Sequence, residues 1–395
     1  MPGAKRRAIV DQDHFAEVVD EDCTVRVRAM SSSSVRGSIF YPKADCTFAD
    51  EQLRAWRSAG LEAVPADVAD QLGDLCGMFL GAFPESVTPL AEQGTFHWVF
   101  RVATDDGQSW IARVARPDVP DAARSLLLDA WAHRRLNASG LPALDVSAVD
   151  VSCSLAPFAF ELLSEAGGES LRKFDSNDDA LKPLLEDLGR RLVAVHALRC
   201  DGFGLLEADA AGATANPRGS CRSWTAYLQV QLERHIATCC DIGAIDSLDA
   251  ARIERHWTEA SSRLVLDSAS LLHGDLGNHN LFADGLGITH LIDWEDCLAG
   301  DPIFDLAFWA TFHPERRHAW LLESYAAEST LRRCALPADF DYRFWSYFLR
   351  ISLAKTVLRH RLGIVDLPGR TPAAARIQRS LEKLESIDDA ATHAT

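Results

Sequence analysis

Residues 272–280 have the sequence LHGDLGNHN, and this stretch is the most informative part of the chain for predicting its fold. Asp275 precedes Asn280 by five residues, and Asp293 follows 18 residues after Asp275 in the triplet Ile-Asp-Trp. Between them lies the dipeptide Asp284-Gly285, which is typical of a tight hairpin turn. The pattern therefore predicts two carboxylates and one carboxamide on short loops that bound a β-hairpin.

These three side chains offer the chemistry that phosphoryl transfer requires. Asp275, on a tight loop that Gly274 permits, can accept the hydrogen bond and then the proton of a substrate hydroxyl. Asn280 offers a neutral oxygen and Asp293 an anionic one, and Mg²⁺ prefers hard oxygen ligands. Brought together, the three groups can hold a metal-bound nucleotide against a hydroxyl, which is the arrangement of a kinase active site.

Further motifs follow in a fixed order: Ile-Asp-Trp-Glu at 292–295, Gly-Asp-Pro at 300–302 and Asp-Leu-Ala at 305–307. With His-Gly-Asp at 273–275, they resemble the aminoglycoside phosphotransferase family, and within it the branch that phosphorylates hygromycin B. The resemblance runs from about residue 63 to at least residue 360. It implies a two-lobed, protein-kinase-like α+β fold, with ATP or GTP and Mg²⁺ as cofactors.

The resemblance also implies a role for each motif residue. Asp275 takes the catalytic role, and Asn280 and Asp293 bind the metal. His273 is expected to be structural rather than an acid or base, because Asp275 already supplies the base. Asp301 and Asp305 are expected to cap a helix and to hydrogen-bond the catalytic loop, rather than to touch substrate.

The nucleotide side of the site carries a weaker signal. The segment at 91–96 lies between two predicted strands, where a kinase places its phosphate-covering loop, but it contains one glycine only. The backbone N–H groups of Gly94 and Thr95 are expected to approach the β- or γ-phosphate. A plain hairpin turn is the alternative interpretation.

Two charged residues fit the remaining parts of a kinase nucleotide site. Arg113, on a predicted strand, takes the place of the phosphate-binding cation, and Asp129, on the following helix, takes the place of its acidic partner. An exposed acid on a helix surface is the alternative for Asp129. The segment Phe160, Glu161, Leu162 and Leu163 is expected to link the lobes, with backbone groups facing adenine.

Periodicity along the chain predicts a small antiparallel-sheet N-lobe and a larger, mostly helical C-lobe. We divide the chain into an N-terminal extension of unknown role (1–62), a nucleotide-binding N-lobe (63–164) and a catalytic and substrate-binding C-lobe (165–395). Strands are predicted at 24–28, 96–102, 110–114 and 155–163. Helices are predicted from Asp50, after Pro65, and near 121–137, 181–195, 224–237, 248–266, 302–309, 316–328, 341–361 and 372–387.

The composition of the chain indicates which binding partners and which cellular compartment to expect. The net charge of −17 argues against nucleic acid and anionic lipid as partners. It favours a cationic small molecule, although simple solubility also explains it. Ten scattered cysteines without a CxxC pair suit a reducing cytosol. No apolar run marks a signal peptide or a membrane span, so we expect a cytoplasmic protein. We further expect a monomer or a homodimer.

The first hypothesis is therefore an ATP- and Mg²⁺-dependent O-phosphotransferase that acts on a hydroxyl of a small molecule, an aminoglycoside or aminocyclitol antibiotic. A metabolic kinase for a sugar or amino alcohol, and a non-catalytic kinase-like binding protein, are the alternatives. A protein kinase is disfavoured because no Ala-Pro-Glu segment follows Asp293. Four acids of the predicted C-lobe either line a polycation site or form solvated surface: Glu323, Glu328, Asp339 and Asp341.

Overall fold

A computed structural model describes residues 36–59, 64–91, 93–94, 96–119, 121–208, 216–364 and 372–393 of the protein. Within these ranges, residues from 36 onward belong to one compact unit. The strand expected at 24–28 lies outside the described residues, and so does Thr95. The division at residues 62 and 164 stays a prediction.

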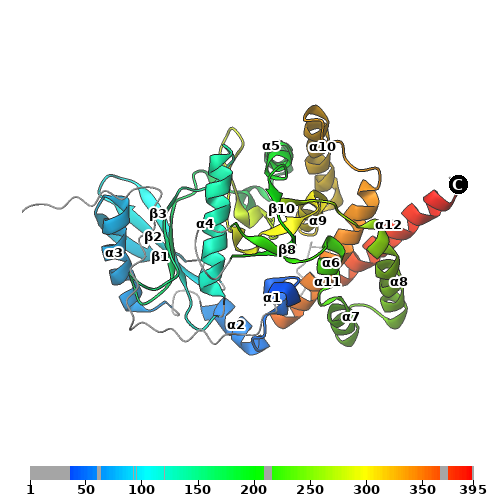
Figure 1. The fold of residues 1–395 in the computed structure, drawn as a ribbon, viewed down its shortest axis with the longest axis horizontal. Helices are drawn as coiled ribbons and strands as arrows, with labels where there is room; N and C mark the ends of the chain where they lie inside the picture. The colour runs from blue at the N-terminus through cyan, green and yellow to red at the C-terminus, as the bar shows by residue number, and fades with distance from the viewer. Residues whose placement is uncertain are drawn as a thin grey trace, which may run out of the picture. The chain divides into compact units, whose positions relative to one another are not determined.

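The N-lobe is an antiparallel sheet in the order β1-β2-β3-β5-β4. The hairpin of β2 and β3 turns at Asp105–Gly107, where Gly107 has a φ of 80°. Helix α3 (Ala66–Leu80) covers one face and α4 (Ala122–Ala138) lies on the other side (Figure 1). The strands are β1 (Pro84–Pro89), β2 (His97–Thr104), β3 (Ser109–Ala115), β4 (Val146–Asp150) and β5 (Phe160–Ser164).

A stripe at helical spacing explains how α3 packs. Val68, Leu72 and Leu75 lie on one side of the helix, and all three are buried against the sheet. Alternate residues of β2, Phe100 and Val102 among them, face the same cluster, because side chains of a strand point to opposite faces in turn. This stripe is therefore the inner face of α3, which ends at Gly81 in the left-handed conformation.

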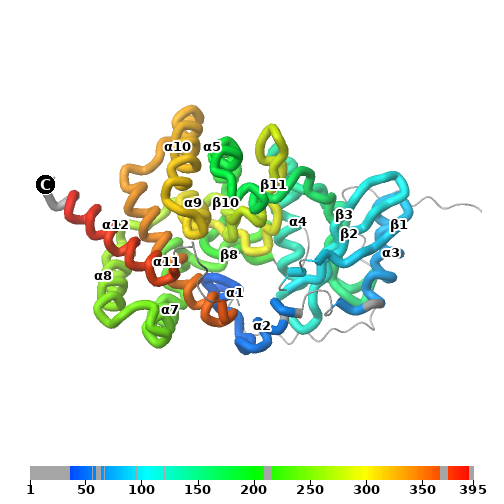
Figure 2. Tube along the Cα trace, turned by 180° about the vertical axis from the view of Figure 1, so that it is seen from behind, coloured from blue at the N-terminus to red at the C-terminus, as the bar shows by residue number. Residues whose placement is uncertain are grey.

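The C-lobe is mostly helical, as predicted. Helix α5 lies beside α10, and α11 packs against α9 and α12 (Figures 1 and 2). The helices are α5 (Asp178–Val195), α6 (Trp224–Gln229), α7 (Leu232–Asp241), α8 (Ser247–Arg263), α9 (Pro302–Ala310), α10 (Glu315–Leu331), α11 (Phe340–Arg361) and α12 (Ala373–His393). The single helix predicted at 224–237 is two helices, because Gln231 has a φ of 58° and breaks it.

Two small sheets carry the loops of the C-lobe. One has the order β7-β10-β13-β8-β9, and the other has the order β12-β11-β6. The predicted hairpin is β11 (Leu281–Ala283) and β12 (Ile288–Leu291), with Asp284-Gly285 in its turn. The remaining strands are β6 (Glu169–Ser170), β7 (Arg199–Cys200), β8 (Phe203–Glu207), β9 (Arg218–Cys221), β10 (Ala269–Leu272) and β13 (Leu298–Gly300).

Residues 36–59, which we name the strap, pack against the C-lobe. The strap comprises the 3-10 helix η1 (Arg36–Ser38), α1 (Pro42–Asp45) and α2 (Asp50–Ala59). Both α1 and α2 contact α11, and η1 contacts β8 (Figures 1 and 2). Three strap residues, Phe40, Tyr41 and Ala44, are buried in the main core of the C-lobe. Part of the predicted extension is thus built into the helical lobe.

Strand β5 corrects one sequence prediction. Phe160, Glu161, Leu162 and Leu163 are not a linker but the inner strand of the sheet. Their backbone groups pair with β3 on one side and with β4 on the other, and a contact of this segment with adenine stays a prediction. The predicted strand at 155–163 correspondingly begins only at Phe160. The apolar run was compatible with either position, since a linker and an inner strand are both apolar.

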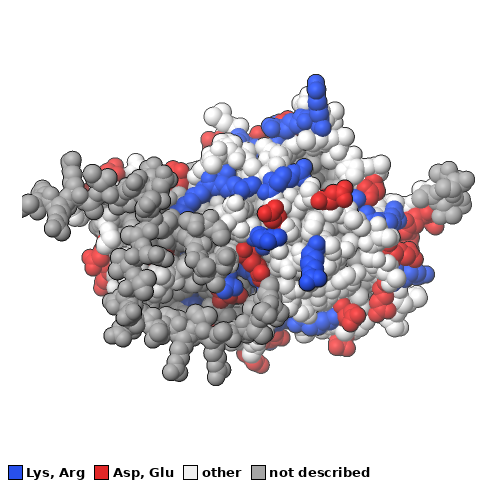
Figure 3. Space-filling model, in the orientation of Figure 1, with Lys and Arg blue, Asp and Glu red and all other residues white. Residues whose placement is uncertain are grey.

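Charges are mixed over the described surface. Lys and Arg side chains lie among Asp and Glu side chains on the face shown in Figure 3, so the acidic excess of the chain is not gathered there into one patch. None of the helices in the described part of the chain combines the length and the apolarity that crossing a membrane requires.

Candidate active site

The loop after β10 turns sharply at Gly274. This residue has a φ of 81°, a conformation that L side chains rarely adopt. A Cβ atom placed there would lie 2.1 Å from the carbonyl oxygen of Asp296. Gly274 is therefore required both by its backbone angle and by close packing, and it places Asp275 at the point where the chain leaves the sheet.

The carboxylate of Asp275 is buried, and two strap residues bind it. The Tyr41 hydroxyl donates a hydrogen bond to Oδ1 at 3.2 Å, and the Lys43 ammonium donates to Oδ2 at 3.1 Å. Burial alone would raise the pKa of Asp275, but the charge of Lys43 and the neighbouring His279 hold it well below its usual range. Asp275 is therefore ionised, as a proton acceptor must be.

Asn280 and Asp293 lie beside this loop. The Asn280 amide nitrogen donates to the Asp275 carbonyl at 3.1 Å, which leaves the amide oxygen as its atom for binding a metal. The Ile292 N–H donates to the Asn280 carbonyl at 3.0 Å, so the residue before Asp293 is tied to Asn280. Asp293 itself has a φ of 67°, and its side chain is 28% exposed. The hairpin thus brings the three predicted residues into one region.

Arg113 and Asp129 form the ion pair that the sequence suggested. The Arg113 Nη1 atom lies 3.0 Å from Asp129 Oδ2, and Asp129 is fully buried. Arg113 also binds Asp293 at 2.9 Å and Glu295 at 2.7 Å. Burial alone would lower the pKa of Arg113, but these carboxylates raise it well above its usual value. Arg113 therefore joins the sheet of the N-lobe to the hairpin of the C-lobe.

Asp129 has a second partner that fixes the same junction. One of its oxygens accepts a hydrogen bond from the backbone N–H of Trp294. Glu161, from β5, lies 3.7 Å from Arg113, and burial raises its pKa well above its usual range. Glu161 thus faces the ion cluster through its side chain, although its backbone belongs to the sheet.

His273 and Asp305 hold the catalytic loop, whereas Asp301 caps a helix. The His273 ring donates from Nε2 to the Ile292 carbonyl at 2.9 Å and accepts the Asp275 N–H at Nδ1. Asp305 accepts the N–H groups of His273 and Gly274 at 2.7 and 3.0 Å. Asp301 caps α9 by accepting the Ile303 N–H at 3.1 Å. Asp301 also accepts hydrogen bonds from Arg343 and Tyr347, so its described contacts lie with α9 and α11 rather than with the catalytic loop.

The segment around Gly94 connects β1 to β2, as predicted. The Gln93 side chain closes it by donating to the carbonyls of Leu90 and Val99 and accepting the Val99 N–H. The Gly94 carbonyl accepts from Arg116 at 3.5 Å. Its phosphate-binding role stays a prediction.

Several residues at the site were not predicted from the sequence. Tyr41 and Lys43 come from the strap, which carries no motif. Glu295 binds Arg113 and also His97, at 3.1 Å, and its place directly after Ile-Asp-Trp was a signal that could have been used. Asp296 has one buried oxygen without a hydrogen-bond partner among the described residues, and burial raises its pKa to about 7.

The four acids considered for a polycation site lie elsewhere. Glu328 pairs with Arg332 at 2.6 Å, and Asp339 pairs with Arg343 at 2.9 Å, while Glu323 and Asp341 are exposed. Glu323 and Glu328 belong to α10, Asp341 belongs to α11, and Asp339 directly precedes α11. All four are therefore surface charges, which was one of the two interpretations of these acids.

The donor set suits a magnesium ion bound together with a nucleotide. No group of three or more His, Cys, Asp or Glu side chains in the described ranges could hold a metal by itself. A site with one amide oxygen and one carboxylate fits Mg²⁺, because this ion keeps waters and takes phosphate oxygens as further ligands. Asn280 and Asp293 are the residues that would hold it.

A sheet lobe with a buried cation, and a helical lobe with an Asp–Asn loop and a hairpin carboxylate, define a protein-kinase-like phosphotransferase. A model of the phosphotransferase enzyme family matches residues 86–344, so the chain belongs to that family. It is therefore an enzyme of the small-molecule kinase class. Among proteins of curated function, none matches the chain in sequence.

Solved structures support the fold at low sequence identity. A thermostable mutant of the aminoglycoside phosphotransferase APH(4)-Ia, in complex with AMP-PNP and hygromycin B, is 18% identical with a TM-score of 0.56. That match covers 81% of this chain and 99% of the other. A protein from Thermobifida fusca described as a fructosamine-3-kinase is 19% identical, with a TM-score of 0.55 and coverages of 80% and 97%. A type I macrolide 2'-phosphotransferase is 14% identical, with a TM-score of 0.52 and coverages of 81% and 98%.

Proposed function

We propose that this enzyme transfers the γ-phosphate of MgATP to a hydroxyl of an aminoglycoside- or aminocyclitol-type small molecule. The observation that carries the proposal is the position of Asp275. It lies on a tight turn that requires Gly274, it is held ionised, and its carbonyl accepts a hydrogen bond from Asn280. A base next to metal ligands is what in-line transfer to a hydroxyl requires.

The chain's own residues divide the work of the reaction. Asp275 accepts the hydrogen bond of the acceptor hydroxyl and takes its proton as the bond to phosphorus forms. Asn280 and Asp293 would hold Mg²⁺, which would neutralise phosphate charge when bound. His273 and Asp305 fix the loop through its backbone, so Asp275 need not reorganise during the reaction.

The nucleotide binds on the side of Arg113. In the structure, the Arg113 fork is engaged by Asp129, Asp293 and Glu295. Asp293 would be the carboxylate that holds Mg²⁺, and Arg113 would offer its positive charge to the nucleotide phosphates. Asp129 and Glu295 keep the cation in place. Backbone groups of Gly94 and Thr95 complete the phosphate contacts in this proposal.

Two acids at the acceptor end favour an amino-bearing acceptor. Asp275 and Asp296 both act electrostatically on Lys43, so a cation already stands at this end of the site. An acceptor with an ammonium near its reactive hydroxyl would meet the same carboxylates. A metabolic kinase for an amino sugar derivative or amino alcohol is a second candidate, because the fructosamine-3-kinase-like protein matches the fold as well as APH(4)-Ia does.

A screen for nucleoside diphosphate release tests the proposal. The panel contains aminoglycosides, hygromycin-type compounds, macrolides, sugars and amino alcohols, each with ATP and Mg²⁺. Asp275→Asn should lower turnover by about 10²- to 10⁴-fold while the affinity for nucleotide survives. Asp267→Asn, at an exposed position, is the matched control and should leave turnover unchanged. A protein that binds MgATP but phosphorylates no compound would be a kinase-like binding protein instead.

A further inference from the structure

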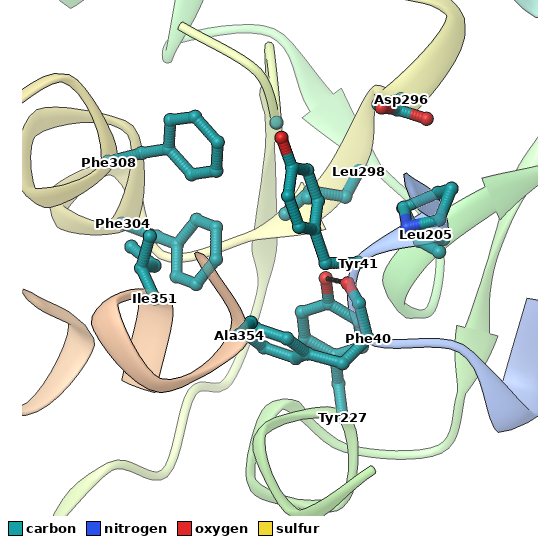
Figure 4. A pocket seen from close by; sticks show the side chains of 12 residues that line it. Phe40, Tyr41, Leu205, Tyr227, Asp296, Leu298, Phe304, Phe308, Ile351 and Ala354 are labelled. Atoms are coloured by element: carbon teal, nitrogen blue, oxygen red, sulfur yellow. Dashed lines mark hydrogen bonds between the residues drawn. The ribbon is translucent and has the colours of Figure 1, made fainter. Parts of the chain in front are cut away.

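The strap fills the acceptor end of the site. Tyr41 lines a small pocket between β8, α9 and α11, together with Gly274 and Asp296. In Figure 4 its ring stands between Phe308 and Asp296, and its hydroxyl points away from Phe40 and Tyr227. Both oxygens of Asp275 are engaged by strap side chains, Tyr41 and Lys43. An outside hydroxyl that approached Asp275 would therefore find these positions occupied.

Buried ring and hydrogen-bond contacts anchor the strap to the C-lobe. The Phe40 ring stacks on Tyr227 at 5.1 Å, and the Tyr227 hydroxyl donates to the Phe40 carbonyl at 2.7 Å. Asp45 accepts the N–H groups of Phe40 and Tyr41 at 2.8 and 2.9 Å. Releasing this segment would expose Phe40, which is 3% exposed, and would break buried polar contacts. Tyr41 is thus held in the site by the packing of the strap.

The Tyr41 hydroxyl makes the contact with Asp275 that the mechanism assigns to an acceptor. It is a hydroxyl at 3.2 Å from the carboxylate oxygen of the base, within reach for proton transfer. Four other tyrosines occur in the chain, and their described hydroxyl contacts go to groups other than Asp275. Resting on the proposed function, we infer that Tyr41 is the enzyme's own phosphoacceptor, phosphorylated in cis on Oη by MgATP.

The reaction is balanced by groups already named. The Tyr41 O–H bond breaks, and its proton passes to Asp275. A bond forms between Oη and the γ-phosphorus of ATP, while the bond from that phosphorus to the β-γ bridging oxygen breaks and ADP leaves. Lys43, 3.1 Å from Asp275, supplies a cation beside the transferred phosphoryl group. No oxidant or further reactant is needed.

Phosphorylation would change the charge of the acceptor end. A phosphotyrosine adds about −1.5 to −2 charges next to Asp275 and Asp296. Burial alone would lower the pKa of Lys43, but the charge of Asp275 raises it well above its usual value, so Lys43 is a cation that would offset the added charge. The phosphate would therefore repel the Asp275 carboxylate. The Tyr41 side chain would then no longer hydrogen-bond to Asp275.

The test uses the full chain with MgATP and no added acceptor. Intact mass is followed over time, and the modified residue is mapped by peptide sequencing. We expect a gain of one phosphoryl group on Tyr41, at a rate per chain that does not change when the protein is diluted. Tyr41→Phe keeps the ring and should take up none, and Asp275→Asn should slow the uptake at least about 100-fold.

Tyr342→Phe is the matched control, because Tyr342 is buried against Arg263 away from Asp275 and should not alter the labelling. The site mapping uses the wild-type chain, so it decides the question even if Tyr41→Phe fails to fold. No phosphate on Tyr41, phosphate on another residue, or a rate that rises with protein concentration would each overturn the inference. Turnover of a small molecule without labelled Tyr41 would overturn it and leave the proposed function intact.

Discussion

Arg113 is the residue on which the junction between the sheet and the hairpin depends. It contacts Asp129, Asp293 and Glu295 within 3.0 Å, and Asp129 has no exposed surface. Removing one partner of a buried ion pair leaves an uncompensated charge in a poorly solvated place. The same guanidinium is the proposed phosphate ligand, so its loss affects both stability and nucleotide binding.

Arg113→Ala should lower the free energy of unfolding by about 3–5 kcal/mol. It should also raise the Michaelis constant for nucleotide more than that for acceptor. Denaturant unfolding and steady-state kinetics measure the two effects. Arg101→Ala is the control, because the Arg101 side chain is 50% exposed in its pair with Glu165 and should cost less than about 1 kcal/mol. Equal changes in both Michaelis constants would argue against a phosphate role for Arg113.

Gly274 gives a second prediction at this scale. Gly274→Ala would place a methyl group 2.1 Å from a backbone oxygen in an unfavourable φ region. We expect the loss of at least about 1–3 kcal/mol of stability and of most activity, because Asp275 would be displaced. Gly285→Ala in the hairpin turn meets no atom within 4 Å and should retain both. Thermal melting and turnover compare the two variants, and equal behaviour would contradict the packing argument.

Residue types and spacing were sufficient to predict one part of the site. Asp275, Asn280 and Asp293 lie within 19 positions of one another, so local loops bring them together. The pair was predicted because Arg113 lies on a predicted strand and Asp129 lies on the helix that follows it. Tyr41 and Lys43 were not, because 234 and 232 positions separate them from Asp275 and nothing local marks such a contact.

At the scale of elements, the strap depends on a buried polar relay. Asp45 accepts from His235 Nε2 at 2.7 Å, and Arg350 donates to His235 Nδ1 at 3.0 Å. This pattern requires a neutral imidazole with its proton on Nε2. Burial lowers the pKa of His235 to about 4, despite the attraction of Asp45. The relay connects α1 of the strap to α7 and α11.

The relay predicts a pH dependence of stability. The folded pKa of about 4 lies below the unfolded value of about 6.5, so between these pH values only the unfolded chain binds the proton. The free energy of unfolding should therefore fall as the pH falls from about 6.5 to 4. A shift of this size corresponds to about 3 kcal/mol. The pKa of Asp45 is lowered from its usual value, so its contribution is lost only at still lower pH.

Denaturant titrations at several pH values test this prediction. His235→Gln should be less stable than the wild type at neutral pH but should lose less on acidification. His256, whose pKa burial also lowers to about 4, adds a loss of the same sign to both proteins and cancels in the comparison. Identical slopes for the two proteins would show that His235 does not titrate in this way.

Elements with a strong period were predicted, and those fixed by tertiary contacts were not. The inner face of α3 and the buried stripe of α5 follow from apolar residues at helical spacing. The break at Gln231 and the identity of β5 as an inner strand depend on packing partners far along the chain. The short strands β6 and β7 are two residues long, so no sequence period could indicate them.

At the scale of the whole molecule, the site is assembled from three regions. The sheet lobe supplies Arg113, the helical lobe supplies the Asp–Asn loop and the hairpin, and the strap supplies Tyr41 and Lys43. The family model begins at residue 86 and therefore leaves the strap outside it. Arg113, the proposed nucleotide ligand, thus falls within the family match, whereas Tyr41 and Lys43 come from a segment that precedes it.

The central claim is that Asp293 and Asn280 hold Mg²⁺ on a nucleotide next to Asp275. Calorimetric titration of ATP with and without Mg²⁺ tests it most directly, and it needs no acceptor. For the wild type and for Asp275→Asn, Mg²⁺ should tighten ATP binding at least about tenfold, or 1.4 kcal/mol. For Asp293→Ala this gain should disappear. An unchanged effect of Mg²⁺ in Asp293→Ala would contradict the account.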